Sequence, residues 1–414
     1  MEKKRTHIFA GKLLILAGTL MLILGFLIPD ASLPAGKPDI IRVSVIGDFS
    51  GPYAPAVGAA RPAVMDAWEY INKELGGVHG VKVEPVLRDM AGKIDLGLSV
   101  YNEVINSKPK SVFVDIIITP LSAALRQRYV EDDVVGFHAG AIDSLYPQGN
   151  SYGFNPLYPE LAGVGLKWIK ENWKEKRNPR VGIITWDTAY GKAILVDEFY
   201  AYAKEIGVDL VGTPQLFGIR DVDVTVQLLN LRGQKSDYLL TNAGGGGALA
   251  IKKGCKEMEW NITLVNTVGC DWGGVRLGPS YFEGDVAVLF VKSFDEADDP
   301  SIKILMKHFN QNNRTINEKT LYYIVSWCNA LLEQKIMTDV VTKFGWEGLN
   351  TKNIKETLNT LKEFAPLNGI TRLSFSQKRR TPKIARVYEI KTGGRLLPLT
   401  DFIEVPDMRP AKFR

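Results

Sequence analysis

The amino-acid sequence predicts an α/β protein of two lobes, each built on a parallel central sheet covered by helices. The chain has 414 residues, too many for one ordinary core and suited to two domains. From residue 40 onward, short apolar segments alternate with amphipathic ones, the pattern of strand–helix–strand units with parallel strands. This alternation runs through two consecutive series, the second beginning near residue 156, so each series predicts one lobe.

The first series begins with a strand at residues 41–46, where apolar and polar residues alternate. Val64, Trp68, Ile71 and Leu75 then form the apolar stripe of a helix that ends at 76–77, a Gly-Gly pair. Further strands are predicted at 81–87, 112–118 and 134–137. Pro85 places the strand at 81–87 on a sheet edge, because proline cannot donate a ladder hydrogen bond.

The second series repeats this order. Its predicted strands are 181–185, 209–211, 238–241, 262–265 and 286–291, and its predicted helices are 161–173, 195–206, 222–232 and 248–258. A helical stretch from 301 to 363 follows, and then a β-like tail at 370–375 and 385–390.

The N-terminus has the order of a secretory signal. Basic residues at 3–5 precede an apolar run from Leu13 to Ile28 and a small-residue stretch that ends at Gly36. The run is shorter than the roughly 20 residues of a spanning helix. We therefore expect 1–36 to be a signal peptide, with an uncleaved anchor as the alternative, and the remainder to be periplasmic or otherwise extracytoplasmic.

Composition argues against several classes of protein. Apolar residues make up 45% and charged residues 23% of the chain, as in soluble globular proteins. The net charge of +5 is partly carried by the N-terminal segment, and the absence of a basic run interleaved with aromatics argues against nucleic acid as a partner. Three cysteines without a CxxC spacing argue against a cysteine-rich zinc site or a disulfide scaffold, although one bridge is possible.

Nothing in the sequence points to catalysis. The chain has four histidines, one of them in the N-terminal segment, and it contains no HExxH, GxxxxGK[ST] or GxSxG motif. We therefore expect a binding protein without cofactor or metal.

Three sequence blocks resemble a known family. They are 45–52 (VIGDFSGP), 186–191 (WDTAYG) and 369–375 (GITRLSF). The first, continued by Gly76-Gly77, Gly80 and Asp89, is similar to the opening of type I periplasmic binding proteins, and the closest branch serves branched-chain amino acid ABC transporters. The resemblance implies two Rossmann-like lobes joined by three crossovers near 155, 291 and 366. The N-terminal lobe would be 38–155 plus 292–365, and the C-terminal lobe 156–291 plus 366–402.

This resemblance places a ligand between the lobes, at the carboxyl ends of the parallel strands. In the N-terminal lobe, Tyr53 would stack on the ligand, or its loop would be a simple turn. Thr119 and Ser122 follow the buried strand, and Ser122 would offer its hydroxyl to a ligand carboxylate or cap a helix. The segment His138-Ala139-Gly140-Ala141 stands where amino acid binders carry Ser or Thr, so His138 would substitute as a donor or be structural.

In the C-terminal lobe, Tyr190 matches a tyrosine that the family often directs into the cleft, with Tyr158 as further aromatic surface. Trp186 would be a second wall or, more simply, core. Gly244 and Gly245 are the first residues of a four-glycine tract. The tract would leave room for a bulky ligand and expose helix N–H groups to it, or it would be a flexible turn. Asp271 is the nearest acid to the place where relatives bind an ammonium group.

The predicted function is therefore the substrate-binding component of an ABC transporter, which captures an amino acid or a related small carboxylate or amide. The partners would be a permease and ATPase complex, and the protein would be a monomer that meets the membrane only through its leader or by docking. The alternative is a ligand-sensing receptor or regulator of the same fold, in which closure signals to a partner.

Overall fold

The computed structural model describes residues 36–268 and 271–414. By its contacts the chain divides into Met1–Pro38 and Asp39–Arg414, and the helices and strands given below belong to the second unit. The predicted signal segment at 1–36 lies almost wholly outside the described residues. In the part that is described, no helix is long and apolar enough to cross a membrane.

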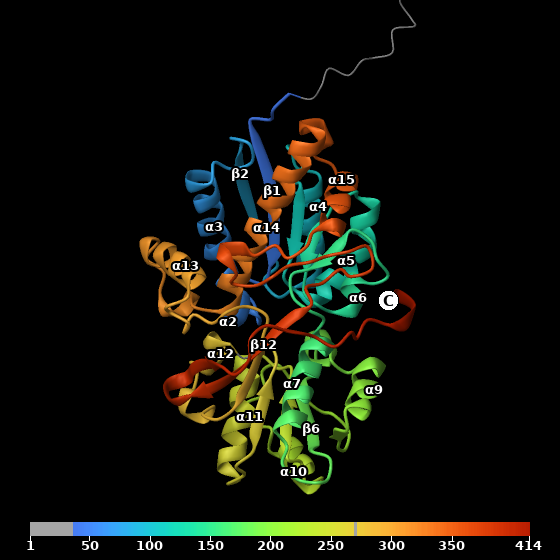
Figure 1. Ribbon diagram of the computed structural model, residues 1–414, viewed down its shortest axis with the longest axis vertical. Coiled ribbons are helices and arrows are strands. Elements are labelled where there is room, and N and C mark those ends of the chain that lie inside the picture. The colour runs from blue at the N-terminus through green and yellow to red at the C-terminus, as the bar shows by residue number, and fades with distance from the viewer. Residues whose placement is uncertain (1–35, 269–270) are drawn as a thin grey trace, which may run out of the picture. The chain divides into compact units, whose positions relative to one another are not determined.

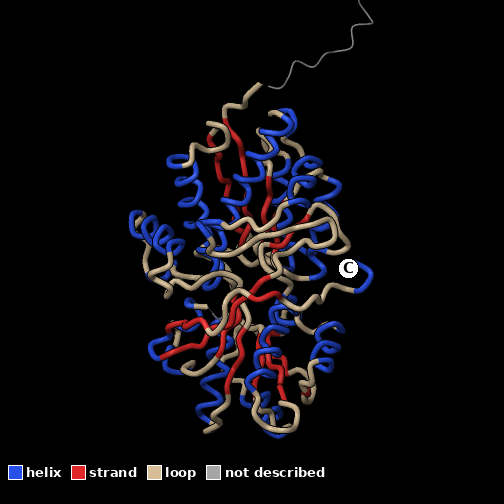
Figure 2. Tube along the Cα trace, viewed as in Figure 1, coloured by secondary structure: helices blue, strands red, loops and turns tan. Residues whose placement is uncertain are grey.

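The first sheet is parallel throughout. It lies in the upper half of the view in Figures 1 and 2. In spatial order it contains β2 (Lys82–Asp89), β1 (Ile40–Gly47), β3 (Phe113–Ile116), β4 (Gly136–His138) and β5 (Ser151–Gly153). The prediction that the Pro85 strand is an edge is confirmed, because β2 ends the order. The predicted glycine stop also holds: α3 ends at Glu74, and Gly76 and Gly77 both adopt positive φ.

Helices cover this sheet, and they come from two distant parts of the chain. They are α2 (Ala54–Val57), α3 (Ala60–Glu74), α4 (Ile94–Ile105), α5 (Thr119–Glu131), α6 (Ile142–Leu145), α14 (Leu321–Phe344) and α15 (Thr351–Thr360). The long helix α14 packs along α3, so residues beyond 300 return to the first sheet (Figure 1).

The second sheet is mixed, and its strands lie in the lower half of the view in Figure 2. Its order is β13 (Arg395–Pro398), β12 (Ile384–Lys391), β11 (Val286–Leu289), β10 (Thr263–Asn266), β9 (Tyr238–Thr241), β6 (Arg180–Trp186) and β7 (Asp209–Leu210), with β8 (Gln215–Phe217) on β6 and β14 (Ile403–Glu404) on β12. The strands up to β11 are parallel, as predicted, whereas the C-terminal strands pair antiparallel. Since β14 joins this sheet, the sheet continues past the predicted end at 402.

The helices beside the second sheet are α7 (Tyr158–Asn172), α8 (Ala189–Lys192), α9 (Asp197–Glu205), α10 (Thr225–Gly233), α11 (Gly245–Glu257) and α12 (Trp272–Val275). The predicted helical stretch at 301–363 is confirmed, and it consists of three separate helices, α13 (Pro300–Gln311), α14 and α15. One sequence prediction was wrong. The predicted strand at 370–375 forms only an isolated bridge, between Phe364 and Leu373, because no neighbouring strand offers it a ladder.

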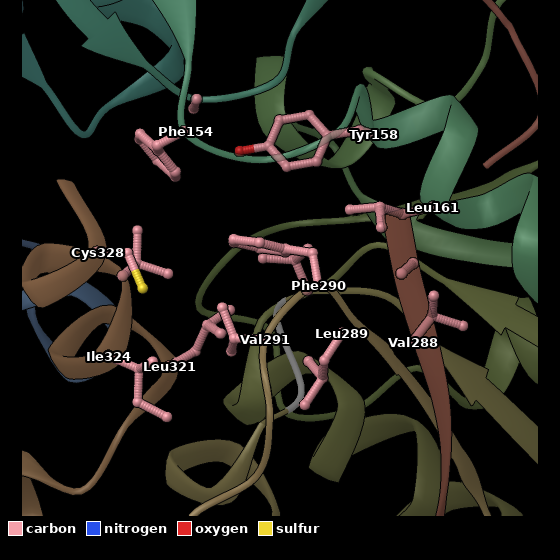
Figure 3. Close-up of a cluster of buried hydrophobic side chains, with 14 of the residues drawn as sticks. Phe154, Tyr158, Leu161, Val288, Leu289, Phe290, Val291, Leu321, Ile324 and Cys328 are labelled. Carbon is pink, nitrogen blue, oxygen red and sulfur yellow. The ribbon is translucent and has the colours of Figure 1, made fainter. Parts of the chain in front are cut away.

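A buried cluster joins the two sheets where the chain passes between them. Phe290 and Val291, just after β11, lie between Phe154 and Tyr158 on one side and residues of α14, including Leu321, on the other (Figure 3). All belong to one continuous hydrophobic core. Burial of this cluster fixes the chain segments on which the two sheets meet.

Candidate functional site

A cavity lies among loops that follow the strands of both sheets. It offers about 530 Å³ of unfilled space, part of it open to solvent. Its lining comprises Tyr53, Ala56, Val57, Ile117, Ile118, Thr119, Pro120, Tyr158, Trp186, Tyr190, Gly244, Val268, Asp271 and Tyr322. Because parallel strands bring their carboxyl ends to one edge, residues that are distant in sequence meet here.

The turn that carries Tyr53 is held by two carboxylates. Asp48 accepts from the Gly51 N–H at 2.7 Å and from the Tyr53 N–H at 2.9 Å. Asp89, at the end of β2, accepts from the Phe49 N–H at 2.9 Å. The loop is therefore a turn, and it also presents the Tyr53 ring to the cavity, so the two predicted roles of this loop are compatible.

Aromatic rings form the walls of the cavity. Tyr53 and Trp186 stand 6.5 Å apart between ring centroids at 76°, and they come from opposite sheets. Trp186 meets Tyr190 at 6.2 Å and 60°, and Tyr190 meets Tyr158 at 5.0 Å and 86°. Burial raises the pKa of Tyr53 and of Tyr158 above the ordinary tyrosine value, so both hydroxyls are neutral at physiological pH.

The four-glycine tract makes room for Trp186. A Cβ at Gly244 would lie 2.5 Å from the indole ring, and one at Gly247 would lie 2.4 Å from its Nε1. A Cβ at Gly245 would lie 2.2 Å from the Gly274 Cα. The prediction that the tract leaves space for a bulky ligand is thus corrected: the indole and a neighbouring backbone fill the space beside Gly244, Gly245 and Gly247.

Asp271 links the two sides of the cavity. It follows β10 of the second sheet, and its carboxylate accepts from the N–H of Leu321, the first residue of α14, and from the Gly274 N–H at 3.2 Å. Burial raises its pKa to about 6, against the opposing effect of these backbone donors, so the carboxylate is mostly ionised at pH 7. Gly269, Cys270 and the side chain of Trp272 lie outside the described residues.

Several predicted site residues do not line this cavity. Ser122 is buried and donates to the Ile118 carbonyl at 3.0 Å, so its hydroxyl serves the first turn of α5. His138 is fully buried against Tyr129, with ring centroids 4.6 Å apart. Burial lowers the pKa of His138 to about 3, and among the described atoms its ring nitrogens have no hydrogen-bond partner. The neutral imidazole therefore behaves as a core group.

The small residues after His138 support a chain crossing. Ala139 and Ala141 are buried in the core. The Gly140 N–H donates to Asn155 Oδ1 at 3.0 Å, and a Cβ at Gly140 would lie 2.2 Å from the Pro156 carbonyl oxygen. Only glycine allows the segment that leaves β5 to pass so close.

Sequence reasoning singled out Tyr53, Thr119, Tyr158, Tyr190, Gly244 and Asp271, all of which line the cavity, and it left out other lining residues. Ile117, Ile118 and Pro120 flank Thr119 at a strand end and could have been found by the same rule. Tyr322 comes from α14, far along the chain, and no local pattern marks it. Trp186 was weighed mainly as core, although it is both buried and a cavity wall.

A second, smaller cavity lies in the first lobe beside α14. It shares Ile117 and Tyr322 with the first cavity and contains Asp115 and Glu333. Burial raises the pKa of Asp115 to about 7, and burial together with the Asp115 charge raises that of Glu333. Asp115 accepts from the Phe137 N–H at 2.8 Å, a bond between β3 and β4 of the first sheet.

The described residues show no group of three or more histidine, cysteine or acidic side chains that could hold a metal ion. Cys255 and Cys328 are separate, buried free thiols, and Cys270 lies outside the described part of the chain.

Comparisons with known proteins agree with this geometry. A family model described as periplasmic binding protein matches residues 40–395. A Leu/Ile/Val-binding protein of Rhizobium johnstonii is 26% identical over 238 residues, which is 55% of this chain and 61% of the relative. A leucine-, isoleucine-, valine-, threonine- and alanine-binding protein of Pseudomonas aeruginosa is 26% identical over 38% of this chain and 42% of its own length. The alignments thus span less than two thirds of these curated relatives.

Solved structures share the fold over a greater length. A branched-chain amino acid ABC transporter protein of Thermus thermophilus with bound valine has a TM-score of 0.79 at 18% identity, covering 91% of this chain and 98% of that one. A fatty acid ABC transporter substrate-binding protein of Thermomonospora curvata has a TM-score of 0.75 at 18% identity, covering 90% and 94%. At this identity the likeness establishes the arrangement of elements.

Proposed function

Since the chain belongs to the periplasmic binding protein family, we propose that it is the extracytoplasmic substrate-binding component of an ABC transporter. It captures a small molecule between two closing lobes, catalyses nothing itself and delivers its cargo to a permease. The observation that carries this proposal is the cavity whose walls come from loops of both sheets.

The two lobes in this proposal are 38–155 plus 292–365 and 156–291 plus 366–402, with crossovers near 155, 291 and 366. The strand order supports this division, because β1–β5 form one sheet and β6–β13 the other. The antiparallel strand β14 argues for extending the second lobe to include 403–404.

Closure is a shift between populations. An open form exchanges solute, and a ligand that touches both lobes favours the closed form by its differential affinity. Two contacts across the cavity support this mechanism, that of Tyr53 with Trp186 and that of Asp271 with the Leu321 N–H. In this mechanism Tyr53, Thr119, Tyr158, Tyr190, Gly244 and Asp271 face the ligand.

The proposed ligand is an amino acid or a related small carboxylate or amide, and the names of the curated relatives support the amino acid. The cavity walls are mostly apolar and aromatic, which favours a ligand with a substantial apolar part.

A thermal-shift screen of the purified protein tests the proposal. The panel contains amino acids, aliphatic and aromatic carboxylates, amides and amines. A ligand at a hundred times its Kd stabilises the folded protein by about 2.7 kcal/mol, so the melting temperature should rise clearly.

The site is tested with Trp186→Leu, which removes one cavity wall and should abolish the ligand-induced rise. Trp168→Leu is the matched control, because Trp168 lies on α7 against Tyr238 and does not line the cavity. A panel without any hit, or a hit that Trp186→Leu leaves unchanged, would contradict the proposal.

A further inference from the structure

The aromatic walls of the cavity are arranged as a box. Its rings are Tyr53, Tyr158, Trp186, Tyr190 and Tyr322. Tyr53 meets Trp186, Trp186 meets Tyr190 and Tyr190 meets Tyr158 at interplanar angles of 60–86°, so these four rings adjoin as walls and do not form a flat stack. Tyr322 adds a fifth ring to the lining. Such an arrangement surrounds a guest with electron-rich rings, which attract cations within about 6 Å of a ring centroid.

The charge of the lining also favours a cation. Within the described residues, no lysine or arginine lines the cavity, and Asp271 is its sole formally charged side chain. A free carboxylate ligand would therefore meet a carboxylate and no basic side chain. A ligand with a positive group would meet the one charge that complements it.

The helix ends near the cavity offer few donors to an anion. The second residue of α5 is Pro120 and the second residue of α7 is Pro159, and proline has no N–H. The Leu321 N–H at the start of α14 already donates to Asp271. Two described helices that begin beside the lining, α8 at Ala189 and α11 at Gly245, have no proline in their first turn.

We infer that the cavity selects ligands with an alkylated ammonium group, held in the box of Tyr53, Tyr158, Trp186, Tyr190 and Tyr322 and complemented by Asp271. This inference rests on the proposed function of solute capture, and it replaces the carboxylate or amide with a cationic ligand class. A trimethylated ammonium fits best, because its charge is spread over methyl groups that lose little hydration on entering an apolar box.

Isothermal titration of the purified protein with a matched pair of probes tests the inference. Choline and 3,3-dimethyl-1-butanol have the same shape, but only choline is charged. We expect choline to bind at least tenfold more tightly than the neutral alcohol. Equal or tighter binding of the alcohol, or no binding of choline, would overturn the inference.

Valine is the third probe and separates the two proposals. Binding of valine without choline would overturn the ammonium inference and leave the transport function intact. If none of the three probes binds, the inference fails, and the thermal-shift screen alone decides the proposed function.

Substitutions test whether the preference for choline arises from the aromatic box and Asp271. Trp186→Leu should weaken choline binding at least tenfold and affect the neutral alcohol less, while Trp186→Phe, which keeps a ring, should retain part of the affinity. Trp168→Leu should leave both affinities unchanged. Asp271→Asn keeps an acceptor for the Leu321 N–H and removes the charge, so it should weaken choline and spare the alcohol. Equal losses for both probes in Trp186→Leu would show a loss of shape alone and overturn the inference.

Discussion

The fit between Trp186 and the glycine tract can be tested with a single methyl group. In Gly247→Ala the new Cβ would stand 2.4 Å from the indole Nε1, whereas ordinary contacts begin near 3.5 Å. The indole must therefore retreat by about 1 Å toward the cavity. The residue before it, Gly246, lies on the same helix, and a Cβ there meets nothing within 4 Å. Gly246→Ala is thus a matched control.

The two substitutions should change the free energy of unfolding differently. Alanine favours a helix over glycine by up to about 1 kcal/mol, and this gain applies to both variants. Overpacking costs about 1–3 kcal/mol and applies only to Gly247→Ala. The free energy of unfolding should therefore rise in Gly246→Ala and stay level or fall in Gly247→Ala, a difference of about 1–3 kcal/mol between the two variants.

Urea denaturation followed by circular dichroism measures this difference in stability. Ligand titration of the same variants measures how a displaced Trp186 side chain changes the affinity of the cavity. Gly247→Ala should weaken binding, because its displaced indole narrows the cavity, while Gly246→Ala should bind like the wild type. If both alanine variants are stabilised equally and bind ligand like the wild type, the packing of Trp186 against the glycine tract is refuted.

Two further predictions concern buried charge. Arg379→Met should lower the free energy of unfolding by about 3–5 kcal/mol in urea denaturation. The substitution removes the bidentate ion pair, at 2.8 Å, that Arg379 forms with the fully buried Glu160. A loss below about 1 kcal/mol would contradict this prediction. The pKa of Asp115 is about 7 in the folded chain, where burial raises it from 3.8. Between about pH 4 and 7 Asp115 therefore holds a proton in the folded chain that it releases in the unfolded chain. Its contribution to stability should fall as pH rises, by at most about 1.4 kcal/mol per pH unit, so urea midpoints should fall less steeply with pH in Asp115→Asn than in the wild type. The same slope in both proteins would contradict the prediction.

Local sequence patterns were sufficient for most of the fold. Alternation of strand-like and helix-like segments predicted both sheets, and Pro85 predicted an edge because its missing N–H is a local property. The tail at 370–375 was predicted wrongly, because a strand needs a partner backbone and its apolar pattern does not reveal whether one is present. The helical stretch at 301–363 was predicted as a whole, and the structure divides it into α13, α14 and α15.

From the sequence, the residues of the site could be predicted only where they follow the end of a predicted strand. Tyr53, Thr119 and Tyr190 follow strands and line the cavity, as this rule requires. Tyr322 reaches the cavity from a distant helix, and the packing of Trp186 on Gly247 joins segments whose proximity only the folded chain creates. For His138, the residue type suggested a donor, but full burial makes its imidazole a neutral core group.

Closure around a ligand is the central claim, and small-angle X-ray scattering of the purified protein tests it most directly. The measurement compares the radius of gyration without ligand and with the compound that raises the melting temperature most. The account predicts a smaller radius with ligand, and no such change in Trp186→Leu at the same concentration. Saturated binding with an unchanged radius in the wild-type protein would contradict it.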